Sequence, residues 1–133
     1  MKTRQVSYFD LFTTGVGYLN RVTEVTMEEG MPFLTVKIAA LRGRAGNVKK
    51  TYFDAKVSGT QAHEWVRVLA DDVAQGRNVL IRFRLSDLEG VPYTSRNESD
   101  EGQTRVSLRT RLIGVDWARV DGQVIQPERQ IAA

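Results

Sequence analysis

Apolar and polar residues alternate along much of this chain with a period of two, which is the pattern of strands that bury one face. The alternation is clearest in residues 77–88, where Val79, Ile81 and Phe83 occupy every second position. Other segments share the alternation or are rich in β-branched residues, which favour strands. The pattern predicts strands over residues 15–27, 33–41, 50–58, 77–88 and 104–120.

One segment has a helical period instead. Its apolar residues form a single stripe along an amphipathic helix: Ala62, Trp65, Val66, Leu69 and Val73. Ser58 and Gln61 have the spacing of a capping box, which predicts that the helix begins at Ser58. Gly76 suits the left-handed position that follows a last helical turn. We therefore expect a helix between the third and fourth strands.

Two further segments contain turn residues. Residues 89–103 hold four acids and one Arg together with Gly, Pro and Asn, so we expect a long, mobile, acidic loop that projects into solvent. Asp121 and Gly122 are typical of a two-residue hairpin turn, and Gln123 to Ile125 would then form a short last strand.

The order of these elements is three strands, one helix and two strands. This order predicts an all-β fold with one helix, namely the five-stranded Greek-key barrel called the OB fold, with the helix between the third and fourth strands. The helix would close one end of the barrel and place Trp65 and Leu69 against the strands. An SH3-like barrel and an α+β sandwich remain alternatives.

A chain of 133 residues has the size of one domain. We divide it into an N-terminal extension (1–14), the OB-fold domain (15–126) and a short C-terminal tail (127–133). The extension contains Tyr8, Phe9, Leu11 and Phe12, which must be buried somewhere. They would pack on their own barrel or on another subunit, and the second choice would give a homo-oligomer, either a dimer or a tetramer.

Composition excludes several classes of site. The chain has no Cys and one His, so it lacks the ligands of the usual zinc sites and has no thiol nucleophile. No apolar run approaches the roughly 18 residues that span a bilayer, and the first residues do not resemble a secretory signal. We expect a soluble cytoplasmic protein with no membrane contact, no cofactor and no metal.

Enzymatic motifs are also missing. His63 stands alone on the predicted helix, and Asp71 and Asp72 are adjacent helical positions whose side chains diverge. Gly15-Val16-Gly17 lacks the third glycine and the following helix of a dinucleotide fingerprint. A Ser-His-Asp triad has no support from a nucleophile-elbow pattern. We therefore expect no catalytic activity.

Positive charge gathers on the outward positions of the strands, although the net charge is only +3. Asp54 is the one acid among the outward positions that we assign. The basic residues there are Lys37, Lys56, Arg82, Arg84, Arg105, Arg109 and Arg111. Alternate strand positions lie about 6.7 Å apart, close to the spacing of successive phosphates in an extended single strand. These residues are predicted to contact phosphates, although a solvated strand face has a similar composition.

Aromatic residues beside such a track would supply stacking surfaces for bases. Tyr52 is the best candidate because it shares the outward face of its strand with Lys56. Phe33 and Tyr93 are weaker candidates. Trp65 and Trp117 are predicted to be packing residues.

Two segments resemble a known family. Residues 8–22 (YFDLFTTGVGYLNRV) and 33–43 look like single-stranded-DNA-binding-like proteins described as replication proteins of integrating conjugative elements, and the resemblance covers nearly the whole chain. More distantly, residues 52–59 and 76–81 are similar to the third strand, helix and fourth strand of bacterial single-stranded-DNA-binding proteins. In that alignment Tyr52 falls where those proteins place a stacking Trp.

The resemblance implies an OB fold, single-stranded DNA binding, oligomerisation through strands, and a role in replicating or transferring a mobile element. Two departures matter. The bacterial proteins carry a tail with an acidic tip that recruits repair enzymes, whereas residues 127–133 have no such tip, so recruitment of that kind is not expected. Tyr in place of Trp at position 52 implies weaker stacking.

Together these observations predict a non-catalytic protein that binds single-stranded DNA with little sequence preference. The alternative is an OB-fold module that mainly binds proteins of a replication or conjugation complex, with weak or no DNA binding. A metal-dependent nuclease is a further rival, and it would need clustered carboxylates that the sequence leaves scattered.

Overall fold

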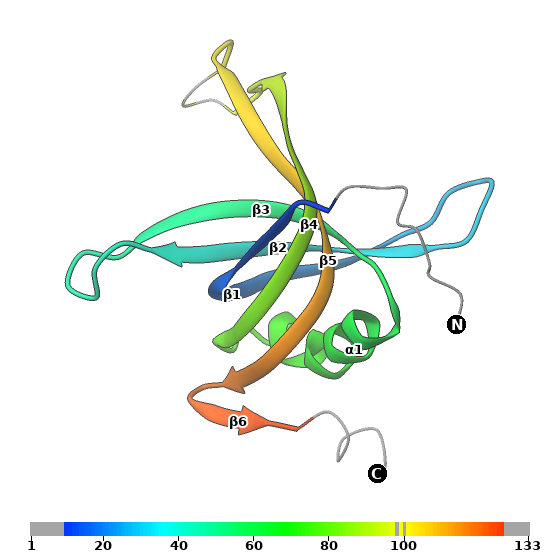
Figure 1. Cartoon of the computed structure of the whole chain (residues 1–133). Helices are drawn as coiled ribbons and strands as arrows, with labels where there is room; N and C mark the ends of the chain where they lie inside the picture. Colours follow the sequence, from blue (N-terminus) through cyan, green and yellow to red (C-terminus); the bar gives the residue numbers. More distant parts are fainter. Residues whose placement is uncertain (1–9, 98, 100, 127–133) are drawn as a thin grey trace, which may run out of the picture.

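The computed structural model describes residues 10–97, 99 and 101–126. Within them the chain forms six strands and one helix (Figure 1). The elements are β1 (Phe12–Val25), β2 (Phe33–Arg42), β3 (Lys49–Val57), α1 (Thr60–Ala74), β4 (Val79–Thr94), β5 (Thr104–Val120) and β6 (Gln123–Ile125). The predicted all-β class with one helix is confirmed, and the helix lies between β3 and β4 as expected.

The strands form a mostly antiparallel sheet in the order β3-β2-β1-β4-β5-β6. β3 also pairs with β5, in parallel, so successive pairings run from β1 through β2, β3, β5 and β4 back to β1. β1 is shared: its first part pairs with β4 and its second part with β2. The β1–β2 register shifts between Leu19 and Arg21, which marks a bulge at Asn20.

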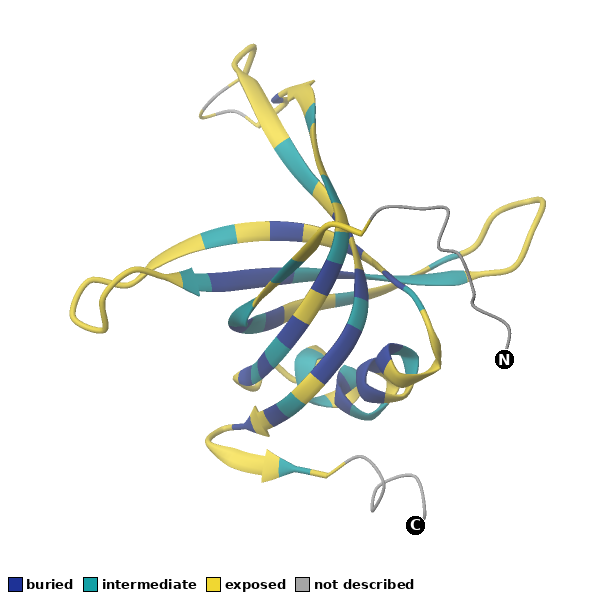
Figure 2. Ribbon diagram, viewed as in Figure 1, coloured by how far each residue is buried: buried dark blue, intermediate teal, exposed yellow. Residues whose placement is uncertain are grey.

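The core lies on the inner side of this sheet. The alternating residues of β4 are almost fully buried, with Ile81 and Leu85 at 0% exposure and Phe83 at 1%. Figure 2 shows this as alternating buried and exposed bands along the strands. Phe53 of β3 meets Phe83 edge to face, with ring centres 6.1 Å apart. The period-two pattern therefore identified the buried faces of β2, β3 and β4 correctly, because the pleat turns successive side chains to opposite sides. In β5 it fails at Val106, which is 59% exposed.

Helix α1 covers one end of the strands (Figure 1). Trp65 and Leu69 are buried in the same cluster as the strand residues, which confirms their predicted packing. Gly76 has a φ of 76°, the left-handed conformation expected after the last turn. The predicted capping box is wrong: the N-cap is Gly59, and no side chain caps the helix. Gln61 instead faces β5 and bonds its backbone.

The predicted acidic loop at 89–103 is also wrong over much of its length. β4 continues to Thr94 and β5 begins at Thr104, so these segments pair as a two-stranded arm that projects from the rest of the sheet (Figure 1). Pro92 is tolerated because both strands of such an arm are edges. The register shifts between Ser86 and Glu89, and Asp87 there has a φ of 57°, which bends β4 where the arm leaves the sheet.

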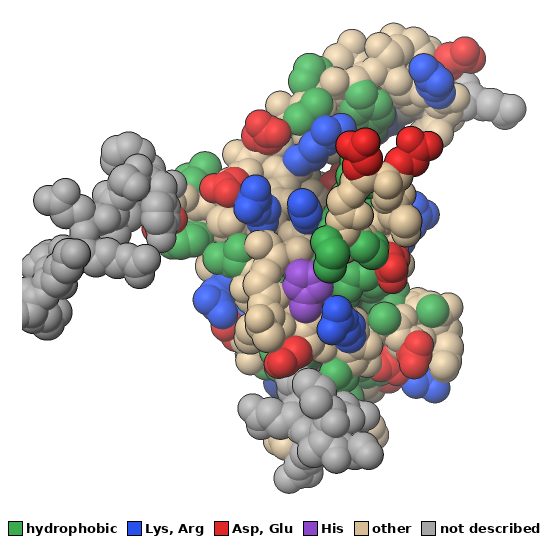
Figure 3. Space-filling view, turned by 90° about the vertical axis from the view of Figure 1, so that its right-hand side faces the viewer, with side chains coloured by type: hydrophobic (Ala, Val, Ile, Leu, Met, Phe, Trp, Pro, Cys, Tyr) green, Lys and Arg blue, Asp and Glu red, His purple; other side chains and the backbone are tan. Residues whose placement is uncertain are grey.

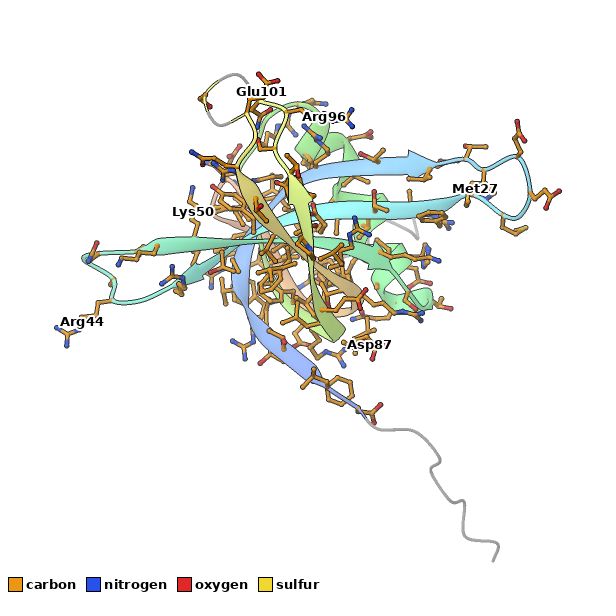
Figure 4. The ribbon with its side chains drawn as sticks, turned by 90° about the horizontal axis from the view of Figure 1, so that it is seen from above. Met27, Arg44, Lys50, Asp87, Arg96 and Glu101 are labelled. Atoms are coloured by element: carbon orange, nitrogen blue, oxygen red, sulfur yellow. The ribbon has the colours of Figure 1, made fainter. Side chains whose placement is uncertain are left out.

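Two other hairpins project from the part of the chain that the structure describes. Seen from above, Met27 near the end of the β1–β2 hairpin and Arg44 in the β2–β3 connection lie on opposite sides, while Arg96 and Glu101 lie at the end of the β4–β5 arm (Figure 4). β1 begins at Phe12, so residues 12–14 belong to the strand and not to an extension. Residues 1–9 and 127–133 lie outside the described part of the chain. Within that part, no helix has the length and apolar character needed to cross a membrane.

Candidate nucleic-acid interface

Four strands bring charged side chains into one row on the outer surface. In the strand register Arg21 of β1 lies opposite Lys37 of β2, and Lys37 lies opposite Asp54 of β3. Asp54 in turn lies beside Arg109 of β5 through the parallel β3–β5 pairing. Neighbouring strands are about 4.8 Å apart, so this row brings together groups that are distant in sequence.

Two adjoining hollows lie over this row. One has a volume of about 630 Å³ and the other about 660 Å³. Both are lined by Lys37, Asp54, Ser107 and Arg109, so they form one continuous depression. We call it the basic groove. Its floor comes from β1, β2 and β3, and the β4–β5 arm forms its wall.

The groove has a strong excess of positive charge. Its basic side chains are Arg21, Lys37, Lys56, Arg105 and Arg109. Among the described residues that line it, Asp54 is the one acid. Glu89 lies opposite Arg109 in the β4–β5 ladder but does not line either hollow. A cleft with one sign of charge concentrates counter-ions of the opposite sign, which here are anions.

A hydrogen bond and a looser ion pair meet at Asp54 in the centre of the groove. The Ser107 hydroxyl donates a hydrogen bond of 2.9 Å to Oδ2 of Asp54, and Lys37 Nζ lies 3.6 Å from Oδ1 of the same carboxylate. The Lys37 and Asp54 side chains are 43% and 49% exposed. Exposed ion pairs of this kind contribute little to stability, so Lys37 can turn toward a phosphate at small cost.

Three aromatic rings border the groove. Tyr52 on β3 and Tyr93 on β4 line the same hollow, and they are 52% and 48% exposed. Phe33 at the start of β2 lines the other hollow, where the ammonium of Lys56 sits 4.6 Å from its ring centre. Exposed rings beside cations are the combination that binds unpaired nucleotides, because bases stack on the rings while phosphates contact the cations.

Seven of the ten predicted site residues line the groove: Phe33, Lys37, Tyr52, Lys56, Tyr93, Arg105 and Arg109. The other three do not line it, although Arg111 lies beside Lys56 in the β3–β5 register. Arg84 Nε is 3.0 Å from Oδ1 of Asp116, and the Arg84 guanidinium packs against Gly114. Arg111 Nε is 3.7 Å from Oδ2 of Asp87. Arg82 lies opposite Val16 and Trp117 in the sheet.

Among the groove residues that sequence interpretation missed are Arg21 and Ser107. Arg21 follows the bulge at Asn20, which changes the phase of the side chains along β1, so no single alternation spans residues 15–27. Ser107 alternates with the apolar positions of β5, but a serine there gives no charge signal. Its role in the groove follows from its hydrogen bond to Asp54, which lies on another strand.

Other residues weighed for chemistry have structural surroundings. Trp65 is buried, and Trp117 is half-buried with Arg119 5.3 Å from its ring centre. Nδ1 of His63 lies 2.7 Å from the backbone oxygen of Gly59, one turn earlier. Basic and acidic side chains are interspersed around this histidine (Figure 3). Among the described residues, no group of three or more His, Cys, Asp and Glu side chains could hold a metal ion.

A family model covers residues 2–133 of the chain. The chain belongs to the family described as "Protein of unknown function (DUF3577)". Membership thus fixes the family without fixing an activity. A comparison with curated proteins finds none that matches.

Proposed function

We propose that this DUF3577 protein has an OB fold. The support is the cyclic order of strand pairings, from β1 through β2, β3, β5 and β4 back to β1, together with a helix between β3 and β4 that covers one end. The shared, bulged β1 and the parallel β3–β5 pairing are what a small Greek-key barrel needs to close on itself.

We further propose that the protein binds single-stranded DNA through the basic groove with little sequence preference. The observation that carries this proposal is the row Arg21, Lys37, Asp54 and Arg109 with exposed Tyr52 beside it. Stacking on Tyr52 or Tyr93 requires an unpaired base, because in a duplex both faces of each base are covered. The groove therefore suits a single strand better than a duplex.

The roles divide by chemistry. Arg21, Lys37, Lys56, Arg105 and Arg109 would neutralise phosphates. Tyr52 and Tyr93 would stack on bases. Phe33 would instead position the ammonium group of Lys56, which covers its ring. Arg82, Arg84 and Arg111 would contribute only to the overall electrostatic potential around the protein.

The wider setting is part of the same proposal. The resemblance of residues 8–22 and 33–43 to replication proteins of integrating conjugative elements supports a non-catalytic cytoplasmic role in replicating or transferring a mobile element. Leu11 and Phe12 are each 59% exposed in the single chain. Large apolar side chains exposed at the start of β1 support a homo-oligomer in which a second subunit covers them.

The proposal is tested by fluorescence anisotropy of labelled oligo-dT and of a duplex of equal length, titrated with the protein at several salt concentrations. We expect tighter binding to the single strand, with a log–log salt slope of up to about −3.5 per subunit, since each neutralised phosphate contributes about −0.7. Equal or tighter duplex binding would contradict the stacking role. Micromolar or weaker binding to both, with no saturable site size, would favour the protein-interaction module instead.

A further inference from the structure

The basic groove contains an acid at its centre. Asp54 lies between Lys37 and Arg109 in the strand register and lines both hollows. A carboxylate repels phosphate, so a surface that served only to hold a DNA backbone would be stronger without it. Its position therefore suggests contact with a different part of the ligand.

The carboxylate of Asp54 has acceptor capacity left over. Oδ2 accepts one hydrogen bond, from Ser107, and Lys37 Nζ approaches Oδ1 at 3.6 Å, which is longer than a hydrogen bond. Two carboxylate oxygens have about four acceptor sites between them. Because the side chain is 49% exposed, the remaining sites face solvent in the groove. Ser107 fixes the orientation of the carboxylate and leaves room for another donor.

The ring of Tyr52 determines where a hydrogen-bond donor of the ligand would lie relative to Asp54. Tyr52 and Asp54 occupy successive outward positions on β3, about 6.7 Å apart along the strand. A base stacked on the Tyr52 ring would extend its polar edge over the strand toward the next outward side chain. The other outward neighbour of Tyr52, Lys50, lies over the ring of Tyr18 and does not line the groove. The group that such a base meets within the groove is therefore the Asp54 carboxylate, with Lys37 beside it.

We propose that Asp54 selects bases that carry an exocyclic amino group, so that the protein binds cytosine-rich strands more tightly than thymine-rich strands. This inference rests on the proposed single-stranded DNA binding. Cytosine presents its amino group as a donor to Asp54 and the neighbouring unprotonated ring nitrogen N3 as an acceptor to Lys37. Thymine presents one N–H between two carbonyl oxygens, and those oxygens repel the carboxylate.

Cytosine and thymine are the informative pair because both are pyrimidines of similar size that stack on the same ring. The experiment measures the dissociation constants of labelled oligo-dC and oligo-dT of equal length, at about pH 8 so that cytosine stays unprotonated. We expect the native protein to favour oligo-dC about threefold or more, because hydrogen bonds to a charged acceptor are the stronger kind.

Asp54→Asn is the decisive variant, because its amide offers a donor where the carboxylate offered only acceptors. It should tighten binding to both oligonucleotides by removing a negative charge, and it should tighten oligo-dT more, so that the preference falls to near one. Asp116→Asn is the matched control. It removes the same charge from an acid that pairs with Arg84 outside the groove, and it should leave the preference unchanged.

The possible outcomes separate the two proposals. If the native protein binds both oligonucleotides equally, or if Asp54→Asn tightens both by the same factor, Asp54 only adjusts the charge of the groove and the inference is overturned while DNA binding stands. If neither oligonucleotide binds, the proposed function itself fails. A preference that survives in Asp54→Asn would place base selection at another residue and would also overturn the inference.

Discussion

The side-chain amide of Gln61 at the start of α1 pairs with both backbone groups of Val115 in β5. Nε2 donates to the Val115 carbonyl oxygen at 2.6 Å, and Oε1 accepts from the Val115 N–H at 3.0 Å. The β4–β5 register is irregular on both sides of Val115. Gln61 thus satisfies backbone groups where the ladder is interrupted and ties the helix to the strand that forms the wall of the groove.

Loss of this pair should destabilise the fold. Gln61→Ala removes both partners of a part-buried backbone N–H and C=O, so we expect the free energy of unfolding to fall by about 1–3 kcal/mol, measured by urea denaturation. Gln61→Glu should also destabilise, because a carboxylate cannot donate to the Val115 carbonyl. Gln75→Ala, at the exposed C-cap of the same helix, is the control, and we expect it to change stability by less than about 0.5 kcal/mol.

Gly17 should not tolerate a side chain. A Cβ there would lie 2.6 Å from the Ala39 carbonyl oxygen and 2.7 Å from the Ala40 Cα, and both are backbone atoms of the neighbouring strand β2. We expect Gly17→Ala to lower stability by about 1–3 kcal/mol, because β1 and β2 must move apart. Gly46→Ala, where a Cβ meets nothing within 4 Å, should unfold at nearly the native urea concentration. Equal midpoints for the two variants would contradict this account.

Arginines inside and outside the groove should differ in their effect on DNA binding. Arg109→Gln removes a groove cation, so we expect weaker binding to oligo-dT and a salt slope that is shallower by about 0.7. Arg84→Gln removes the same charge from a side chain that pairs with Asp116, and it should leave the slope unchanged. Equal slopes in the two variants would mean that binding reflects net charge and not this surface.

Tyr52 should act by stacking and not by charge. Tyr52→Ala is expected to weaken oligo-dT binding by about 1–3 kcal/mol while leaving the salt slope nearly unchanged. Tyr52→Phe keeps the ring and should retain most of the affinity. If Tyr52→Phe binds as weakly as Tyr52→Ala, the hydroxyl and not the ring makes the contact.

The β4–β5 arm should be separable from the fold. Val91 lies opposite Ser107, so an Asn-Gly turn in place of residues 92–106 would close a shorter hairpin. We expect an unfolding midpoint close to that of the native chain, because the arm strands are mostly exposed. DNA binding should weaken about tenfold through loss of Tyr93 and Arg105. Native affinity in this variant would restrict the interface to the floor of the groove.

Local patterns predicted some elements better than others, for physical reasons. The inward faces of β2, β3 and β4 follow from alternation alone. The capping-box prediction was wrong because the side chain of Gln61 bonds elsewhere. The backbone of Val115 in β5 offers it both a donor and an acceptor. The acidic loop failed because Gly90 and Pro92 are turn signals in isolation, whereas pairing with residues 104–109 satisfies the backbone of this segment as a hairpin.

The candidate site was predictable in content and not in arrangement. Alternation shows which side chains face outward, but it does not show where each strand lies in the sheet. The sequence therefore predicted one set of cations that contains both groove residues (Lys37, Lys56, Arg105 and Arg109) and residues that do not line the groove (Arg82, Arg84 and Arg111). The β3–β5 pairing sets Arg109 beside Asp54 and Arg111 beside Lys56, whereas Arg84 lies on β4 and faces Asp116.

The sequence by itself determined the inward faces of β2, β3 and β4 and the place of the helix, because periods of two and of 3.6 residues are properties of a local segment. Only the tertiary structure decided that Arg21, Lys37, Asp54 and Arg109 share one row. Their register depends on how β1, β2, β3 and β5 pack over a common core, and that packing joins segments too far apart in the chain for any local pattern to relate.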